Sequence, residues 1–409
     1  MNKKISVAIV GAGAVGLSTA RALTELGVEE VVVLERTHPA SGSSGRSVGV
    51  VETQYVDPFD IALRVPSKRV FEELEHDHGL RFTRNGYLRI GHTEEDAARF
   101  ERSVAVQREL GIEDAVVLDA KGIAERFPDV RCDDISAGLH GPSDGFVDGH
   151  LYCGLLAELA TAKGARLLQH TKLSSHELLP DGRHRLRTSS GELTCEYVVN
   201  AAGAWAQEVG VQLGVATPIL PQRHEAVAMH LPRTLDYMMP EVMDYAPAEG
   251  RSGLYFRHET FDMFLGGLHS EEAVHPVVDP DEWFEGVEQS YLEQLAELLP
   301  HRLPSLADIR LGRGWAGLYP VSPDGRPLVG PCHEDATVIA ACGVGGYGIQ
   351  VSPIVGQLAA EWVVFGEARS LAEAGELLPG RASLSSQVST QAPSGERSGM
   401  KTAIEGRKG

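Results

Sequence analysis

The chain has 409 residues, of which 43% are hydrophobic, so it is long enough to bury two cores, and we expect two domains. Its formal net charge of −20 would repel a nucleic-acid backbone and an anionic membrane surface, so we expect neither partner. The sequence has no uninterrupted run of about 18 apolar residues, which disfavours a transmembrane helix.

The five cysteines are isolated from one another and form no CxxC pair. An odd number of such cysteines suits free thiols in a reducing compartment better than a disulfide framework, so we expect a cytoplasmic protein. The 16 histidines show no paired spacing with cysteine or carboxylate, and we expect no metal site.

The N-terminal segment carries a nucleotide-binding pattern. Residues 5–10 form an apolar run typical of a buried parallel strand, and Gly11, Gly13 and Gly16 follow at once. Residues 15–26 then carry apolar side chains at helical spacing, and residues 30–34 predict the next strand.

These elements, with Glu35 closing the second strand, make up a dinucleotide fingerprint. Gly11 permits the tight turn, Gly13 lets the backbone approach a pyrophosphate, and Gly16 lets helix and strand pack closely. The Glu35 carboxylate can accept hydrogen bonds from ribose hydroxyls and would repel the 2′-phosphate of NADP. The alternative is a glycine-rich turn that binds nothing. The fingerprint does not separate FAD from NAD, so an NAD-linked dehydrogenase stays open here.

Two segments after the fingerprint favour FAD. Residues 41–49 form a loop of serines and small residues that could wrap a diphosphate and the edge of a flavin ring, or be an ordinary surface loop. Residues 197–205 form an apolar strand that ends in small residues, near the expected place of an adenine or ribose.

A third such segment lies near the C-terminus. Residues 337–350 predict a strand that runs into a glycine-rich loop. We expect Ser352 to cap a helix that begins at Pro353 and continues to about Phe365. The N-terminus of that helix would present free N–H groups and partial positive charge to the N1/O2 edge of a flavin, unless the loop serves only strand-to-helix packing.

At these segments the chain resembles the D-amino acid oxidase and sarcosine oxidase-like superfamily of FAD-dependent oxidoreductases, from residue 5 to about 366. It is most similar in pattern to D-arginine dehydrogenase and its relatives and to the beta subunit of multimeric sarcosine oxidases. The motifs that carry the resemblance are Gly45-Arg46-Ser47 with Tyr55, Trp315 to Asp324, and Gly345 to Gln350.

The resemblance implies that the chain oxidises the C–N bond of an amine or amino acid by hydride transfer to FAD, giving an imine that water hydrolyses. It also leaves open that the chain is the FAD-binding subunit of a larger opine- or sarcosine-type dehydrogenase.

The implied fold is α/β: a Rossmann-type FAD-binding domain, with a parallel sheet, helices and a β-meander, and an inserted α+β substrate domain. The FAD-binding domain would comprise residues 1–50, 148–214 and 310–378, and the substrate domain residues 51–147 and 215–309. We expect the meander in residues 165–194 and a disordered tail in residues 379–409. In the substrate domain, residues 84–90 and 253–268 predict strands, and residues 64–78, 94–110 and 282–299 predict amphipathic helices.

The resemblance also implies the site residues. Around the substrate it places Tyr55, Arg223, Tyr255, Tyr319 and Gln350. The tyrosines could bind a carboxylate or pack as aromatic core, and Arg223 could bind a carboxylate bidentately or form a salt bridge. The expected FAD contacts are Gly11, Gly13, Ala14, Val15, Gly16, Glu35, Arg36, Ser43, Ser44, Arg46, Ser47, Val48, Leu173, Ala202, Gly203, Trp205, Gly345, Gly346, Tyr347, Gly348, Ile349 and Gln350.

Three departures from the relatives matter. Gly317 stands where some of them attach FAD through a cysteine, so we expect FAD to be bound non-covalently. No lysine occurs between Lys172 and Lys401, so the lysine that promotes reaction with oxygen is missing, and a quinone or dye is expected as acceptor before oxygen. Gln350 and Tyr319 replace carboxylate-binding lysine and arginine residues, so an amine without an α-carboxylate stays open as substrate.

Overall fold

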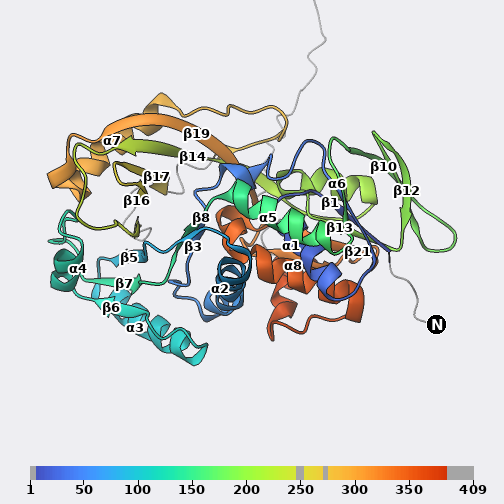
Figure 1. Cartoon of the computed structure of the whole chain (residues 1–409), viewed down its shortest axis with the longest axis horizontal. Coiled ribbons are helices and arrows are strands. Elements are labelled where there is room, and N and C mark those ends of the chain that lie inside the picture. Colours follow the sequence, from blue (N-terminus) through green and yellow to red (C-terminus); the bar gives the residue numbers. More distant parts are fainter. Residues whose placement is uncertain (1–5, 246–252, 270–274, 385–409) are drawn as a thin grey trace, which may run out of the picture.

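The nucleotide-binding half is built on a six-stranded sheet. A computed structural model describes residues 6–245, 253–269 and 275–384 of the chain (Figure 1). The strand order is β20-β21-β13-β1-β2-β9, and every neighbouring pair is parallel except β20–β21. The predicted α/β fold with a Rossmann-type sheet is therefore confirmed. The strands are β1 (Ser6–Val10), β2 (Glu30–Leu34), β9 (Arg166–Leu168), β13 (Tyr197–Asn200), β20 (Leu328–Pro331) and β21 (Val338–Cys342).

Both faces of this sheet are covered. Val7 and Ile9 of β1 pack into one apolar cluster together with helices α1, α5 and α8, while Ala8 and Val10 pack into a second cluster on the other face. Alternate residues of a strand point to opposite faces, which explains why β1 is apolar throughout. The helices are α1 (Ala14–Glu25), α5 (Gly149–Ala162) and α8 (Gly348–Phe365).

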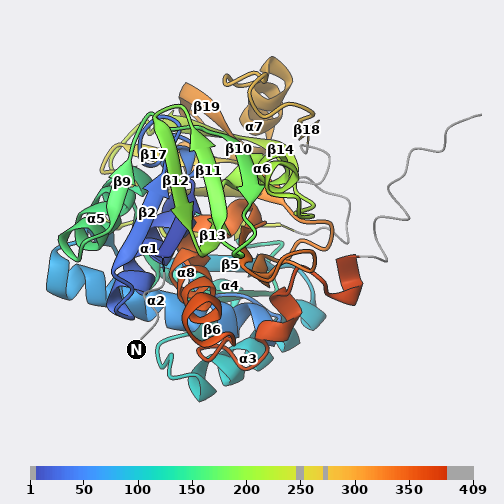
Figure 2. The same ribbon diagram turned by 90° about the vertical axis from the view of Figure 1, so that its right-hand side faces the viewer.

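The second face carries the predicted meander and helix α6 (Ala206–Leu213). Strands β10 (Leu173–Leu178), β11 (His184–Thr188) and β12 (Gly191–Cys195) pair antiparallel in sequence order and stand in front of the parallel sheet in Figure 2. The meander is thus present, but residues 166–168, the first strand of its predicted segment, join the parallel sheet instead.

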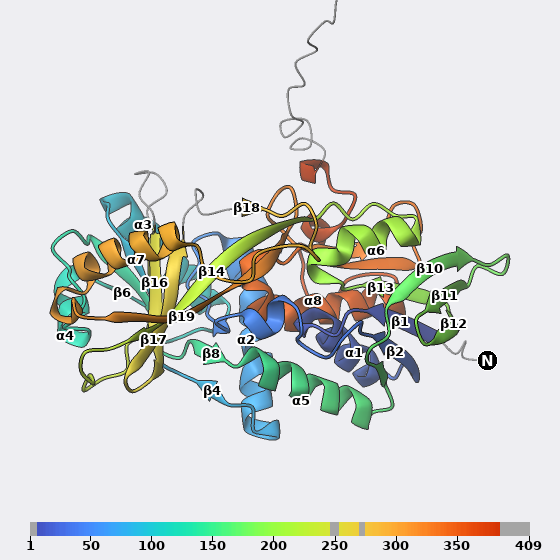
Figure 3. The same ribbon diagram turned by 90° about the horizontal axis from the view of Figure 1, so that it is seen from above.

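The other half of the molecule is a nine-stranded, largely antiparallel sheet, seen beside the first half in Figure 3. Its order is β18-β14-β17-β16-β15-β5-β7-β6, with β19 paired to β14, and β15–β5 is its parallel pair. The strands are β5 (Tyr87–Gly91), β6 (Val116–Leu118), β7 (Ala137–Gly141), β14 (Leu220–His230), β15 (Glu241–Asp244), β16 (Gly253–Thr260), β17 (Met263–His269), β18 (His275–Pro276) and β19 (Arg310–Val321).

Helices α3, α4 and α7 flank this sheet, and its apolar core includes Leu295 and Leu299 of α7. The helices are α3 (Glu94–Glu109), α4 (Ala120–Arg126) and α7 (Gln289–Arg302). The predicted helix at 94–110 is confirmed, whereas the one predicted from residue 282 begins only at Gln289.

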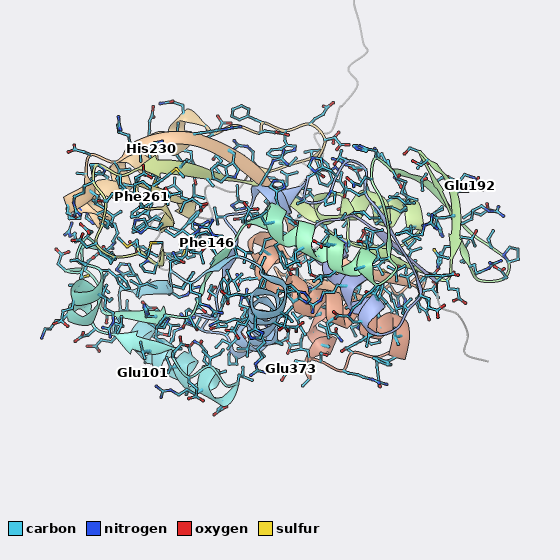
Figure 4. The ribbon with its side chains drawn as sticks, in the orientation of Figure 1. Glu101, Phe146, Glu192, His230, Phe261 and Glu373 are labelled. Carbon is cyan, nitrogen blue, oxygen red and sulfur yellow. The ribbon has the colours of Figure 1, made fainter. Side chains whose placement is uncertain are left out.

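Helix α2 (Pro58–His78) and a three-stranded sheet lie between the two halves (Figure 1). The helix contains the predicted segment 64–78 and packs against α8. The strands are β3 (Val50–Val51), β4 (Phe82–Thr83) and β8 (Gly145–Val147), and Figure 4 shows Phe146 of β8 in the middle of the molecule.

The predicted domain boundaries stay a prediction, and the pairing of strand β19 bears on one of them. Strand β19 pairs with β14 over nearly its whole length, although residue 310 was expected to open a piece of the FAD-binding domain. Of the predicted tail, residues 385–409 lie outside the described residues. Among the helices of the described ranges, none has both the length and the apolar character needed to cross a bilayer.

Candidate functional site: a cavity between the parallel sheet and the large sheet

A cavity of about 630 Å³ runs along the ends of β1, β2 and β13 toward the large sheet. Most of the expected FAD contacts line it, although they come from segments far apart in the sequence. The lining members of that set are Gly11, Gly13, Ala14, Val15, Glu35, Arg36, Ser43, Ser44, Arg46, Ser47, Val48, Leu173, Ala202, Gly203, Trp205, Gly345, Gly346, Gly348 and Ile349.

Two helices point their N-termini at this cavity. Helix α1 begins at Ala14 and α8 at Gly348, and residues of both first turns are among the lining residues. The Ala14 N–H donates to the Ser44 hydroxyl (3.0 Å), which draws the loop at 41–49 over the start of α1. A helix N-terminus carries unpaired N–H groups and partial positive charge, so the cavity suits a ligand with a diphosphate.

Glu35 lies at the end of β2, is 7% exposed and lines the cavity. Its Oε2 accepts from the Ala12 N–H (2.9 Å) and its Oε1 from the Thr37 N–H (2.8 Å). The carboxylate is thus fixed at the cavity wall by the chain on either side of it, in the position from which a ribose could be bound.

Three expected FAD contacts do not line the cavity. Gly16 packs against the turn: a Cβ there would lie 2.0 Å from the Gly11 carbonyl oxygen, so its role is the close helix–strand approach. The Tyr347 hydroxyl donates to the Gly325 carbonyl (2.5 Å), outside the cavity. Gln350 is buried on α8, and its Oε1 has no hydrogen-bond partner within the described ranges.

The start of α8 corrects the predicted capping residues. The helix begins at Gly348, directly after the short 3-10 turn of residues 345–347, so Ser352 is not its N-cap and Pro353 is an interior residue. Proline has no N–H to offer the Ile349 carbonyl, and the Ser352 hydroxyl donates to that carbonyl instead (2.8 Å). This local replacement explains how the helix tolerates its proline.

Two of the residues expected around a substrate, Tyr255 and Tyr319, line the cavity on the side of the large sheet. Tyr319 stacks on His224 (3.8 Å between ring centres), and a Cβ on Gly346 would lie 2.3 Å from its Cε2. Burial raises the pKa of Tyr319 to about 12, so its hydroxyl is neutral at physiological pH and can both donate and accept.

Arg223, also expected around a substrate, is not among the residues that line the cavity. Its side chain is 6% exposed and already paired: Nε donates to the Phe284 carbonyl (2.8 Å), and Nη2 contacts the Glu225 carboxylate (2.9 Å) and the Gly286 carbonyl. Its partners Phe284 and Gly286 belong to residues 279–287, which we call the strap.

The strap lines the cavity, and a helix was predicted from its residue 282 onward. Asp281 pairs with Arg36 (2.6 Å) and accepts from the Trp205 indole N–H (2.8 Å), while Glu285 pairs with Arg46 (3.1 Å). The strap has no regular secondary structure, and Arg223 binds its Phe284 and Gly286 carbonyls. Helix α7 therefore starts seven residues later than the amphipathic pattern predicted.

A buried polar cluster lies beside the cavity. It contains Tyr55 and Tyr347, which were expected at the site, together with Glu52, Arg64 and Arg89, which sequence reasoning missed. Arg64 lies over the rings of Tyr55 and Tyr347, and Arg89 lies over Tyr55. Burial raises the pKa of Glu52 to about 7, against the opposing effect of Arg89 and Arg64. The available signal was in α2, where Arg64 and Lys68 fall on the same helical face as Ile61 and Phe71.

Comparison with known proteins identifies the family. The sequence model of the family described as FAD dependent oxidoreductase, DAO, matches residues 6–362. The chain belongs to this family. Its cofactor is therefore FAD, which agrees with the two helix N-termini and the Glu35 carboxylate in the cavity and sets the NAD alternative aside.

The curated relatives of this DAO family chain include longer proteins. Dimethylglycine dehydrogenase, mitochondrial, of Rattus norvegicus is 28% identical over 88% of this chain and 43% of that protein. Sarcosine dehydrogenase, mitochondrial, of Homo sapiens is 26% identical over 88% of this chain and 40% of that protein. The chain thus spans less than half the length of these relatives.

Solved structures share its fold. L-proline dehydrogenase from P. horikoshii superposes with a TM-score of 0.79 at 23% identity, covering 91% of this chain and 96% of the other. Glycine oxidase from Geobacillus kaustophilus gives a TM-score of 0.76 at 24% identity, covering 92% and 98%. The likeness extends over both halves of the molecule.

Proposed function

We propose that this chain is an FAD-dependent oxidoreductase that oxidises the C–N bond of an amine or amino acid. The observation that carries the proposal is the continuous cavity, which joins the fingerprint residues at one end to Tyr255 and Tyr319 at the other. The printed names of relatives support the chemistry, since dimethylglycine, sarcosine and proline dehydrogenases all act on amines.

Bound FAD supplies the difficult step, accepting a hydride from the carbon next to the substrate nitrogen, and water hydrolyses the resulting imine. The chain's own residues bind the cofactor and orient the substrate. The N-termini of α1 and α8 and Glu35 would hold the cofactor, while Tyr255 and Tyr319 line the space in which the reacting C–H bond would lie. The FAD contacts we propose are the expected residues that line the cavity.

We expect the purified protein to be yellow and to release FAD into the supernatant on acid precipitation. Gly317 lines the cavity and stands at the position of covalent attachment in relatives. Because glycine has no side chain, it cannot form a bond to a flavin there. The check is the absorbance of supernatant and pellet after precipitation. Flavin that stays with the pellet would show a covalent link elsewhere, and a colourless protein would remove the basis of the proposed function.

We also propose that oxygen is a poor electron acceptor. A fixed positive charge beside the flavin stabilises the negative charge that develops on oxygen during the first electron transfer, and its removal should cost several kcal/mol of that barrier. Of the arginine and lysine residues that line the cavity, Arg36 pairs with Asp281 (2.6 Å), Arg46 pairs with Glu285 (3.1 Å), and Lys172 lies beside Leu173 at the meander. In stopped-flow experiments, reduced enzyme should react with oxygen much more slowly than with a quinone or dye. Oxygen reoxidation as fast as turnover would make the protein an oxidase.

A second candidate is that the chain works as the FAD-binding subunit of a larger dehydrogenase. The observation that favours it is that the chain matches less than half the length of dimethylglycine and sarcosine dehydrogenases. Co-purification of the chain at natural expression level would reveal an iron–sulfur or second flavin subunit. We keep a cytoplasmic location as part of the proposal, although several relatives are named as mitochondrial.

The experiment that tests the proposed activity is incubation of the holoenzyme and a dye acceptor with amines and with D- and L-amino acids. Oxidation at the C–N bond predicts a carbonyl product and a released amine or ammonia. Dye reduction without these products would point to a different bond.

A further inference from the structure

The strap brings contacts from the large-sheet half to the nucleotide-binding half. It connects β18, which pairs with β14, to α7, whose apolar side chains join the core of the large sheet. Between these two elements it reaches Arg36, Arg46 and Trp205, which line the cavity. Because the strap has no regular secondary structure, these contacts and its attachment to the large sheet decide where it lies.

The C-terminal part of the strap is held by a buried group and by the sheet. The Arg223 guanidinium, which is 6% exposed, donates to the Phe284 and Gly286 carbonyls. The Ala316 N–H of β19 donates to the Glu285 carbonyl (2.9 Å). Hydrogen bonds from a buried charged donor are among the stronger ones in proteins, so this part is a fixed root for the strap.

The N-terminal part of the strap, residues 279–283, is held more lightly, and we call it the tip. Within the described ranges, every hydrogen bond and ion pair from the tip to the nucleotide-binding half ends on one atom, the Asp281 Oδ1. This oxygen pairs with Arg36 Nη1 (2.6 Å) and accepts from the Trp205 indole N–H (2.8 Å). The Arg36 guanidinium also stacks on the Trp205 ring, 3.9 Å from its centre, so the two donors are held together. We call this contact the latch.

The tip is a single layer of chain between the cavity and solvent. Pro280 is buried and lines the cavity, whereas its neighbours Asp279 and Glu282 are exposed. Trp283 also lines the cavity, with its ring 5.5 Å from the Arg46 guanidinium carbon. Outward movement of the tip would therefore open the wall of the cavity at this place.

The latch lies at the end of the cavity where Glu35 stands, because Arg36 follows Glu35 directly. Its two charged side chains are only partly covered, with 35% of Arg36 and 44% of Asp281 exposed. An ion pair of this exposure is weak, and salt screens it further. A weak contact at the tip and a strong one at the root would let the tip open while the strap stays attached.

We propose that the tip covers the Glu35 end of the cavity and that the Asp281 latch controls how fast FAD enters and leaves. Opening breaks the two bonds on the Asp281 Oδ1, while Arg223 keeps the root in place. The inference rests on FAD as the cofactor and not on the bond that the enzyme oxidises.

A latch has a kinetic signature that differs from that of a cofactor contact. Its bonds join protein groups, so they favour the closed tip equally with and without FAD. Weakening them raises the fraction of open tip in both forms, which speeds FAD entry and release by the same factor and leaves the dissociation constant unchanged. Loss of a side chain that binds FAD would instead raise the dissociation constant.

The test follows FAD exchange without turnover. Holoenzyme loaded with radiolabelled FAD is mixed with excess unlabelled FAD, and the label that stays with the protein is counted over time. The association rate is measured by quenching of FAD fluorescence on mixing with FAD-free protein. We expect Asp281→Ala to raise both rates about fivefold, with the dissociation constant within about twofold of the wild-type value.

Two further variants and salt isolate the latch. Asp281→Asn keeps an oxygen for the Trp205 indole and loses the charge, so its release rate should lie between those of the wild type and Asp281→Ala. Glu282→Gln removes an equal charge from the same tip and should release FAD at the wild-type rate. Raising the salt concentration from about 0.05 M to about 0.5 M should speed release from the wild type more than from Asp281→Ala.

Three results would overturn the inference. The first is a release rate in Asp281→Ala within twofold of the wild-type rate. The second is a raised dissociation constant with an unchanged association rate, which would make Asp281 part of the cofactor site. The third is faster release from Glu282→Gln equal to that from Asp281→Ala, which would assign the effect to the net charge of the tip. If Asp281→Ala fails to fold, the same comparisons are made with Asp281→Asn.

Discussion

Replacing Gly16 with valine is expected to prevent formation of a stable holoenzyme. The nearest atom to a Cβ at this position is the Gly11 carbonyl oxygen, at 2.0 Å, and Ala201 is also in contact. Both are parts of the packed turn between β1 and α1, so the helix would have to move away from the sheet. Overpacking of this kind costs about 3 kcal/mol or more when backbone must shift.

The matched control is Gly13→Ala, three residues earlier in the same turn. A Cβ there meets only the Ser44 hydroxyl, at 3.2 Å, and would project where Gly13 lines the cavity. We therefore expect the FAD-free form of Gly13→Ala to unfold in urea close to the wild type while its FAD dissociation constant rises about tenfold or more. For Gly16→Val the unfolding midpoint itself should fall. A lowered unfolding midpoint in Gly13→Ala, or a raised FAD dissociation constant with an unchanged midpoint in Gly16→Val, would contradict the assignment of Gly16 to packing and Gly13 to the cofactor.

Replacing Glu35 with alanine is expected to weaken FAD binding by roughly 1.5 to 3 kcal/mol, or about tenfold or more in the dissociation constant. The carboxylate lies at the cavity wall and is held there by the Ala12 and Thr37 N–H groups (2.9 and 2.8 Å). Its charge-assisted hydrogen bonds to ribose hydroxyls would be lost. The measurement is fluorescence titration of the FAD-free protein with FAD.

Glu35→Gln is the control for this prediction, since it keeps the size and one oxygen of the side chain and removes the charge. Its FAD affinity should lie between those of the wild type and Glu35→Ala. An FAD dissociation constant equal to the wild-type value in Glu35→Ala would place the adenosine elsewhere in the cavity.

The nucleotide-binding unit is predictable from sequence because its signals are local. Gly11, Gly13 and Gly16 are needed for one turn, and Glu35 closes the next strand, so a short stretch of chain specifies the whole unit. The likeness to a known superfamily extended this prediction to the loop at 41–49 and to the end of β13, which line the same cavity.

The substrate side was less predictable because its contacts join distant segments. Arg223 looked available in the sequence, but its partners are the carbonyls of the strap some sixty residues away. Arg64 looked like an ordinary helix residue, and only the fold brings Tyr347 over it. The start of α8 was misplaced because Pro353 is a common first residue of helices, whereas here the Ser352 hydroxyl replaces the missing N–H.

The most direct test of the proposed function is anaerobic mixing of the purified holoenzyme with a panel of amines and D- and L-amino acids. We expect at least one amine or amino acid of the panel to bleach the visible absorbance of oxidised flavin, with formation of a carbonyl product. Bleaching by dithionite but by no member of a broad panel would contradict oxidation of a C–N bond as the function of this cavity.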